Sequence, residues 1–506
     1  MTVFATGAVI LVLEIVGSRI LAPFFGSTQY VWSSLIAVTM LALAMGYWMG
    51  GRLADSFDPF PVLFRLLTAA GWLVLLLTLI RGAVLKSAIA LGLGAGALVA
   101  SLILLAPPLT ALGCVAPLAA KIAVGALEHL GLKVGGLYAL STLGSLLGAL
   151  AAGFALVPVL GVGKILFLCA LLLFLPSLYF WVAAPRTSER RFLRFAAGLG
   201  LIVCMMGLAA RQDYPVVRGD EWAVLHKSDS SYGEVKVVQH RSARILLLDG
   251  AMQTGIEMES HLPVFSYASA IPALALAANP KARKVLLIGF GGGIVAETFA
   301  LQGLSVESVE IDPEVVKAAR RYFVRRDDLP VTEEDGRTYL ARSPAGRFDI
   351  VILDAYAGEA PPAHLFTVET YAMVRRVLAP GGIGVANLIT FTSGNRAKLL
   401  RCVGRTIRSV FPWVSAYAVE ESRGAVNVLC LFSDKPRRPK RLADIPMLGV
   451  VADRIKGMLE RRIELDFSDA FPLTDDYNPI ETMALAARGG MRRHIVDLFP
   501  GWVLLQ

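Results

Sequence analysis

The sequence has few cysteines and no metal-binding pattern. Its 506 residues include five cysteines, and no two of them stand at CxxC spacing. Three lie in apolar runs, where a free cysteine behaves as a small buried hydrophobic residue. We therefore predict no metal site. The five are Cys114, Cys169, Cys204, Cys402 and Cys430.

Acidic residues are scarce in the N-terminal part of the chain. Residues 1–212 hold 13 Lys and Arg against 5 Asp and Glu, whereas the rest of the chain holds 36 against 35. Because the excess positive charge belongs to the apolar part, it indicates loops near lipid headgroups. The C-terminal part does not concentrate basic residues with interleaved aromatics, so we predict no nucleic-acid partner.

Long apolar runs fill residues 1–212, and a bilayer span needs about 20 such residues. We predict a transmembrane domain of seven or eight helices and a lipid bilayer as partner. The last run is short enough to lie in the membrane interface instead. The candidate spans are 3–24, 31–50, 62–80, 86–106, 108–127, 135–160, 162–183 and 195–210, with Pro107 and Pro108 between the fourth and fifth.

Small and charged residues mark particular faces of these helices. Glu14 and Arg19 lie within the first span, where charges usually face a partner or a wet cavity. They either neutralise each other or a neighbouring helix, or they line a polar substrate pocket. Glycines four residues apart allow close packing of helix backbones. These pairs are Gly46 and Gly50, Gly92 and Gly96, and Gly144 and Gly148.

The pattern changes after residue 212. Short apolar segments at 235–238 and 244–248, with an Asp249-Gly250 turn, predict a small β region over 213–260. From residue 261 onward, strand 284–288, a glycine loop, a helix from Ile294 and strand 306–310 form the first half of a doubly wound nucleotide-binding sheet. We therefore predict a Rossmann-like α/β domain over 261–506.

Carboxylates follow the predicted strands of this domain. Glu310 ends the second strand and can accept both ribose hydroxyls, and Asp335 stands where a third strand ends, suited to an adenine amino group. Asp354 ends a fourth strand, 348–354, and a fifth follows at 383–387. This order is typical of class I methyltransferase folds, because a dinucleotide-binding protein has no obvious use for Asp354. We therefore predict S-adenosylmethionine or its decarboxylated form as co-substrate.

At these residues the chain resembles the spermidine synthases, the polyamine aminopropyltransferases, over roughly 225–430. Segment 248–253 is similar to their substrate gate, and the glycine loop, 309–312, Asp335-Gly336 and the Asp354 strand come in family order. The whole chain resembles a bacterial branch that carries a membrane region before this domain. The segments of that closer match are 136–144, 354–358 and 473–479.

The resemblance implies transfer of an aminopropyl group from decarboxylated S-adenosylmethionine to an amine, with release of methylthioadenosine. It implies Asp354 as catalytic base, and we add Tyr356 as a second catalytic residue. The cofactor-binding candidates are Gln253, Gly289, Gly291, Gly293, Glu310, Asp312, Asp335 and Gly336. The substrate-binding candidates are Tyr232, Glu359, His364, Asp475 and Asp476.

Two departures from the family pattern keep other readings open. Gly292 and Ala357 stand where the family has aspartates, so intact S-adenosylmethionine could bind in the space left at Gly292. The chain would then be a methyltransferase, an aminocarboxypropyl transferase or a lyase. A third reading is a transporter with a nucleotide-sensing domain. In every case we expect a multi-pass protein of the cell membrane, with its soluble domain in the cytoplasm where the cofactor is made, and we allow for a homodimer.

Overall fold

The computed structural model describes residues 1–123, 130–183, 188–210, 215–218, 221–356, 358–422, 424–439, 455 and 457–505. The chain forms two compact units, one of residues 1–213 with 499–506 and one of residues 214–498. The sequence-based boundary after residue 212 lies beside this division, but the last eight residues group with the helical unit. Ala357 and the end of the predicted span 108–127, from residue 124 onward, lie outside the described residues.

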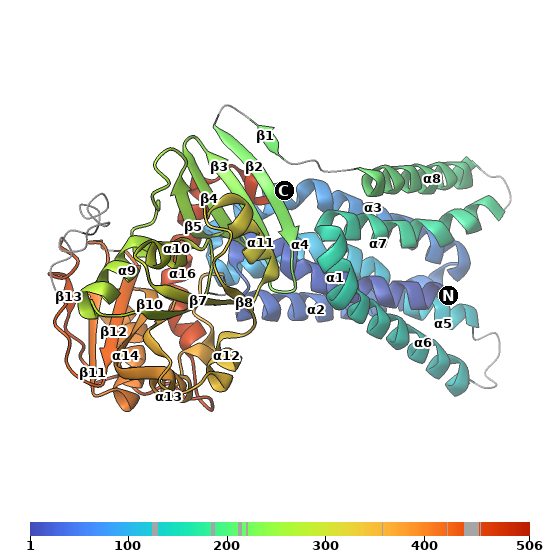
Figure 1. Ribbon diagram of the computed structural model, residues 1–506. Helices are drawn as coiled ribbons and strands as arrows, with labels where there is room; N and C mark the ends of the chain where they lie inside the picture. The colour runs from blue at the N-terminus through green and yellow to red at the C-terminus, as the bar shows by residue number, and fades with distance from the viewer. Residues whose placement is uncertain are drawn as a thin grey trace. The chain divides into compact units, whose positions relative to one another are not determined.

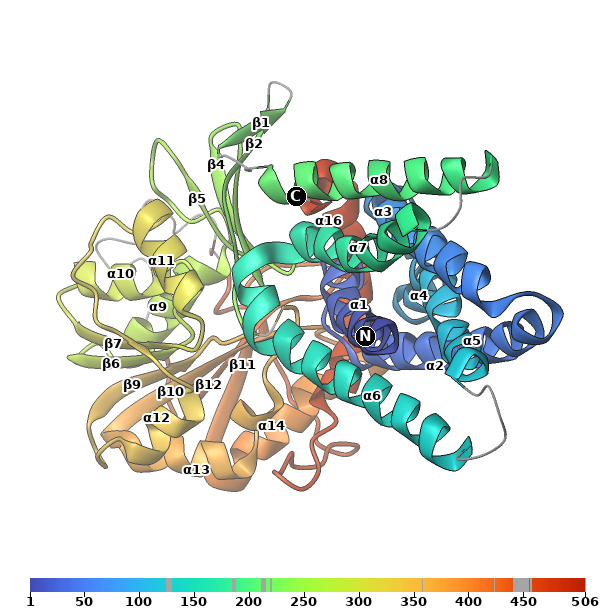
Figure 2. The same ribbon diagram turned by 90° about the vertical axis from the view of Figure 1, so that its right-hand side faces the viewer.

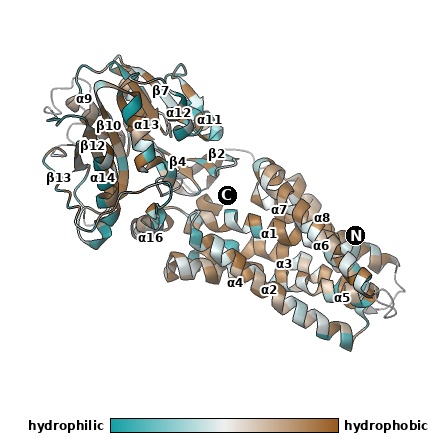
Figure 3. Cartoon of the chain, turned by 90° about the horizontal axis from the view of Figure 1, so that it is seen from below, coloured by the Kyte–Doolittle hydropathy of each residue, from teal (hydrophilic) through white to brown (hydrophobic). Residues whose placement is uncertain are grey.

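The helical unit consists of long apolar helices (Figure 1). Among the described residues, six helices are long and apolar enough to cross a membrane, against the seven or eight spans predicted. Figure 3 shows them coloured hydrophobic over most of their length. The elements are α1 (Thr2–Phe25), α2 (Gln29–Ser56), α3 (Pro59–Ala88), η1 (Ile89–Leu91), α4 (Leu93–Gly113), α5 (Val115–Ala123), α6 (Leu130–Ala151), η2 (Ala152–Leu156), α7 (Val157–Ala183), α8 (Ser188–Ala209) and the C-terminal α17 (Gly501–Leu505).

One predicted span boundary is wrong, and another coincides with a kink inside a continuous helical stretch. Pro107 and Pro108 lie inside α4, because a proline within an apolar helix is tolerated where neighbouring groups satisfy the freed carbonyls. Helices α3 and α4 instead separate at Gly92, whose φ of 86° ends the helical backbone. Spans 135–160 and 162–183 form one helical stretch of 52 residues, broken by non-helical dihedral angles at Gly161.

Glycines bring the helix backbones of this unit together as predicted for two of the three pairs. A Cβ atom on Gly46 would lie 2.5 Å from the Thr110 carbonyl oxygen of α4, and one on Gly144 would lie 2.1 Å from the Phe4 carbonyl oxygen of α1. Substitution at either position would therefore force two helices apart. Glu14 and Arg19 are both half-buried on α1.

The second unit begins with an antiparallel sheet of five strands in sequential order, which confirms the predicted small β region. Strands β4 and β5 pair from Leu248 to Ala251, so Asp249 and Gly250 form a two-residue hairpin turn. Both have positive φ, 47° and 74°, as a type I′ turn requires. The strands are β1 (Val216–Arg218), β2 (Trp222–Asp229), β3 (Glu234–His240), β4 (Ala243–Leu248) and β5 (Ala251–Glu257).

An eight-stranded sheet follows, in the order β13-β11-β12-β10-β9-β6-β7-β8. The strands from β10 to β8 in this order pair in parallel. Strand β12 pairs antiparallel with β10, β11 with β12, and β13 with β11. The strands are β6 (Lys284–Ile288), β7 (Ser305–Glu310), β8 (Val331–Glu333), β9 (Phe348–Leu353), β10 (Leu378–Thr390), β11 (Trp413–Ala418), β12 (Val426–Ser433) and β13 (Arg462–Ile463). The predicted fold class, an apolar helical part with a Rossmann-like domain and a small β region, is confirmed.

Helices cover both faces of this sheet (Figure 2). One face packs on α9 (Tyr267–Ala278), α10 (Ile294–Leu301) and α11 (Pro313–Tyr322), and the other on α12 (Gly336–Arg342), α13 (Val368–Val377) and α14 (Lys398–Val410). Because both faces are buried, the central strands are almost wholly apolar, as in the segment Lys-Val-Leu-Leu-Ile of β6. A further helix, α16 (Ile480–Leu498), contacts β5, β10 and α14.

Candidate active site

The second unit contains a cavity of about 780 Å³ at the carboxyl ends of its parallel strands. This is the edge where open α/β sheets bind their ligands. The glycine loop after β6 and residues 252–254 of β5 form part of its wall, and Asp354 and Tyr356 after β9 form another. The end of β10, the start of β12 and one face of α16 complete it.

The glycine loop lies directly against the segment that carries Asp354. Gly289 has a φ of 95°, and a Cβ atom there would lie 2.3 Å from the Asp354 carbonyl oxygen. Gly293, with a φ of 77°, begins α10. Any larger residue at Gly289 would push Asp354 out of place. The structure therefore brings the predicted cofactor loop and the predicted base together.

Glu310 holds the glycine loop against β7. Its Oε2 accepts hydrogen bonds from the Phe290 and Gly291 amides at 3.0 and 3.2 Å, and its Oε1 accepts from the Ile311 and Asp312 amides at 2.9 and 3.2 Å. Burial raises the pKa of Glu310, and these amides oppose the rise. Ribose hydroxyls would have to share or replace these four bonds, because a carboxylate offers about four acceptor positions.

Asp312, like Glu310, is not among the described residues that line the cavity. Its Oδ1 accepts a hydrogen bond from the Glu314 amide at 2.9 Å and caps α11, and its Oδ2 accepts one from the Ser230 hydroxyl at 2.6 Å. Burial raises the pKa of its carboxyl. The expected cofactor contact of Asp312 is thus replaced in this structure by a helix cap and a link to the turn after β2.

Asp335 and its neighbours form a separate polar cluster after β8. Asp335 caps α12 through the Thr338 amide at 2.9 Å, and its Oδ2 lies 2.7 Å from His364 Nε2. Burial alone would raise the pKa of Asp335, but the bonds from Thr338 and His364 lower it. Gly336 packs on β6, because a Cβ atom there would lie 2.4 Å from Ile288 Cγ2. His364 thus contacts the predicted adenine-binding residue and does not line the cavity.

The remaining substrate-binding candidates do not line the cavity either. Asp475 forms a two-bond ion pair with Arg337 at 2.7 and 2.5 Å, and Asp476 is exposed. Tyr232 is 55% exposed in the turn between β2 and β3. Glu359 Oε1 lies 2.5 Å from Arg492 Nε in a buried ion pair. The sequence could not show these partners, because each lies far from its candidate along the chain.

Asp354 is the buried carboxylate of the cavity. Burial raises its pKa to about 7, while a hydrogen bond from Asn387 Nδ2 to its Oδ1, 2.8 Å long, lowers it. Asn387 Oδ1 in turn accepts from Asn427 Nδ2 at 3.1 Å. Sequence reasoning missed both asparagines. Their signal was a polar side chain near the cavity end of the otherwise apolar strands β10 and β12.

Tyr356 is bound to the backbone of β10. Its hydroxyl accepts a hydrogen bond from the Ile389 amide at 2.7 Å and donates one to the Asn387 carbonyl at 3.2 Å. Burial raises the pKa of the phenol well above its usual value, and the nearby Asp354 raises it further. Tyr356 therefore lines the cavity as a neutral phenol that fixes the Asp354 loop on β10.

Gln253 ties β5 to the same loop. Its Nε2 donates to the Gly358 carbonyl at 2.8 Å, and its own carbonyl accepts from the Tyr267 hydroxyl at 2.5 Å. Burial raises the pKa of Tyr267, as does the nearby Asp354. Tyr267 was also missed from the sequence, where it is one aromatic residue at the start of an apolar helix. The predicted gate segment thus reaches the wall of the cavity.

The space expected at Gly292 is filled by Thr254. A Cβ atom on Gly292 would lie 2.2 Å from Thr254 Cγ2, and Thr254 is 3% exposed. The position directly beside Gly292 is therefore occupied by Thr254, and the room for a donor carboxylate near Gly292 stays a prediction. The methyl group of β5 takes the place that a side chain of the glycine loop would need.

This contact gives a testable prediction. Gly292→Ala should lower the stability of the protein by about 1–3 kcal/mol through overpacking. The double variant Gly292→Ala with Thr254→Ser, which lacks the obstructing methyl group, should recover most of that loss. Thermal unfolding in detergent measures both variants, with Thr254→Ser alone as control. Equal melting temperatures for Gly292→Ala and for the double variant with Thr254→Ser would show that the two positions do not interact.

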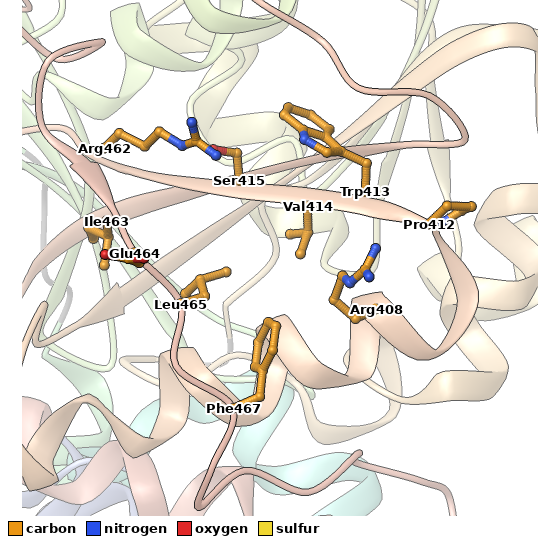
Figure 4. A pocket seen from close by; sticks show the side chains of 10 residues that line it. All are labelled: Arg408, Pro412, Trp413, Val414, Ser415, Arg462, Ile463, Glu464, Leu465 and Phe467. Carbon is orange, nitrogen blue, oxygen red and sulfur yellow. The ribbon is translucent and has the colours of Figure 1, made fainter.

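A second cavity, of about 590 Å³, lies beside the start of β11 (Figure 4). Arg408 of α14, Trp413 and Ser415 of β11 and the segment 462–467 line it. Glu464 is the only carboxylate among its described lining residues. The described lining residues of this cavity include no carboxylate with an asparagine beside it, such as Asp354 with Asn387 in the first cavity. The first cavity is therefore the candidate active site.

Comparison with known proteins agrees with this assignment. Residues 264–422 match the family model of the spermine/spermidine synthase domain. The chain is 30% identical to a polyamine aminopropyltransferase of Vibrio vulnificus over 229 residues, which cover 42% of this chain and 74% of that relative. It is 31% identical over 196 residues to a probable polyamine aminopropyl transferase of Bifidobacterium longum, covering 38% and 43%.

A probable spermidine synthase from Corynebacterium glutamicum superposes with a TM-score of 0.41 at 19% identity, covering 48% of this chain and 91% of that one. The sequence match to the Vibrio relative spans 74% of that protein, and the matched family domain, 264–422, contains the glycine loop and Asp354. The chain therefore belongs to the polyamine aminopropyltransferase family.

Proposed function

We propose that this protein transfers an aminopropyl group from decarboxylated S-adenosylmethionine to an amine and releases methylthioadenosine. The single observation that carries this proposal is Asp354, a buried carboxyl group with a pKa of about 7 in the main cavity. A general base works best when its pKa lies near the operating pH. The apolar helices support a multi-pass enzyme of the cell membrane, and we propose that its soluble unit faces the cytoplasm.

In the proposed reaction, the acceptor amine attacks the aminopropyl carbon bound to the sulfonium sulfur. A carbon–nitrogen bond forms, the carbon–sulfur bond breaks, and its electron pair goes to sulfur, so methylthioadenosine leaves uncharged. The proton lost by the amine passes to Asp354. Since the sulfonium is already a good leaving group, the protein mainly aligns the two reactants and removes this proton.

In the proposed site, some residues around the cavity bind the donor and others position the base. We propose that the glycine loop and Glu310 hold the nucleoside of the donor, with Asp335 and Gly336 toward its adenine. Asn387 fixes one oxygen of Asp354, and Tyr356 and Gln253 hold the loop that follows. In this proposal, five of the predicted residues act through helix caps, ion pairs or surface contacts. They are Asp312, Glu359, His364, Asp475 and Tyr232.

A second candidate is an enzyme that uses intact S-adenosylmethionine, because Gly292 lacks the family aspartate. Calorimetric binding of the detergent-purified protein to both donors separates the two. We expect tighter binding of the decarboxylated donor, with methylthioadenosine formed when an amine is added. Tighter binding of the intact donor would contradict the proposal, and S-adenosylhomocysteine as product would identify a methyltransferase.

A further inference from the structure

The wall of the main cavity carries more basic than acidic side chains. Its described lining residues include Arg396, Arg493 and His494 on the basic side, and Asp354 and Glu420 on the acidic side. Asp354 is half-buried, whereas the other four side chains are exposed. Around the opening, therefore, three basic groups face one carboxylate.

The two arginines are not committed to ion pairs. Among the described residues, neither Arg396 nor Arg493 pairs with a carboxylate. Arg396 lies over the Phe391 ring, with 4.4 Å from its guanidinium carbon to the ring centre. Arg493 donates from Nε to the Gly489 carbonyl of its own helix at 3.2 Å. Planar guanidinium groups of this kind bind carboxylate or phosphate by two parallel hydrogen bonds.

The order of strands puts this basic rim on the acceptor side of Asp354. Arg396 follows β10, and Arg493 and His494 come from α16, which contacts β10. The glycine loop and Glu310 follow β6 and β7, on the other side of β9. Strands β10 and β7 are three positions apart, about 14 Å at the usual spacing of ~4.8 Å. The strand order thus places Arg396 on the side of Asp354 away from the donor nucleoside, while α16 contacts both β10 and β5.

We infer that the acceptor is a primary amine that also carries an anionic group, a carboxylate or a phosphate, rather than a simple diamine. This inference rests on the proposed aminopropyl transfer. The amine would enter toward Asp354 and the anionic group would lie at Arg396 and Arg493. The second ammonium of a diamine would instead meet three basic side chains at that position, with Glu420 alone to offset them. The product is a secondary amine that keeps the anionic group.

The test compares two acceptors of equal methylene chain, 1,4-diaminobutane and 5-aminopentanoate, with 3-aminopropyl phosphate as the phosphate probe. The readout is kcat/KM for methylthioadenosine release by the full-length protein with decarboxylated donor. We expect the anionic amines to be preferred by the wild type. Arg396→Glu with Arg493→Glu should shift the ratio toward the diamine by about tenfold or more. Arg405→Glu, an exposed arginine of α14 outside the cavity, is the matched control and should leave the ratio unchanged.

Each contrary outcome has its own meaning. A wild-type preference for 1,4-diaminobutane that the double variant does not alter would overturn the inference and leave the aminopropyl transfer standing. No methylthioadenosine with any acceptor would overturn the proposed function and the inference with it. A double variant that changes KM for the decarboxylated donor, with the acceptor ratio constant, would place the arginines at the donor site and also overturn the inference. The charge-neutral Arg396→Gln with Arg493→Gln should lie between the wild type and the glutamate variant.

Discussion

Asp354→Asn is expected to lower methylthioadenosine release by about 10²–10⁴-fold, the contribution of a positioned general base. The amide has nearly the same shape, so the fold and donor binding should survive, but it cannot accept the proton of the attacking amine. The measurement is kcat with saturating decarboxylated donor, together with donor affinity by calorimetry. Unchanged affinity with lost turnover would place Asp354 in the chemical step.

The matched control is Asp349→Asn, on the same strand but at its amino end. Asp349 Oδ2 accepts hydrogen bonds from the Arg283 and Lys284 amides at 2.8 and 2.9 Å, outside the cavity. This variant should keep most of its activity. In the wild type, kcat should rise with pH toward about 7 and then level, because Asp354 must lose its proton before it can accept another. A flat profile, or an active Asp354→Asn enzyme, would contradict the assignment of the base.

The sequence predicted the central sheet well because its physical signal is local. Strand β6 is a short apolar run followed by glycines, and β9 ends at Asp354, so both could be read without tertiary information. The antiparallel strands β11 and β12 were not predicted. Strand β12 pairs with β10, which joins residues about 40 positions apart, and β11 pairs with β12. The helix break at Gly92 was missed because apolar runs on both sides conceal it, whereas the predicted division between spans 135–160 and 162–183 coincides with the kink at Gly161.

The candidate site was predicted in part, for a related reason. Residues at strand ends, such as Asp354 and the glycine loop, reach the cavity because parallel strands share one carboxyl edge. Residues on the loops beyond these ends were assigned by proximity in sequence, and the structure gives them other partners. Glu359 is five residues after Asp354, yet its partner is Arg492, 133 residues further along the chain. No spacing rule can show such a partner.

The Glu359–Arg492 ion pair leads to the second large expected effect. Their side chains are 3% and 0% exposed, and Arg492 Nη1 also donates to the Asp249 carbonyl at 2.8 Å. Arg488 is buried beside them, where burial lowers its pKa and Glu359 opposes that change. Because the pair joins the loop after Asp354 to α16 and to the β4–β5 turn, it should contribute to the shape of the cavity wall as well as to stability.

Glu359→Gln should lower the free energy of unfolding by about 3–5 kcal/mol, because it leaves buried arginine without its counter-charge. Replacing both partners with apolar residues, Glu359→Leu with Arg492→Met, should cost less than the single change, since the buried charge of Arg492 is removed together with its partner and Arg488 alone keeps a buried charge. Asp328→Asn, which breaks the exposed pair with Arg326, is the control and should cost at most about 1 kcal/mol. Thermal unfolding of the full-length protein in detergent measures the stability of the three variants. If Glu359→Gln had the same melting temperature as Asp328→Asn, the pair would be an exposed contact in solution. Glu359 would then again be a candidate for binding the amine.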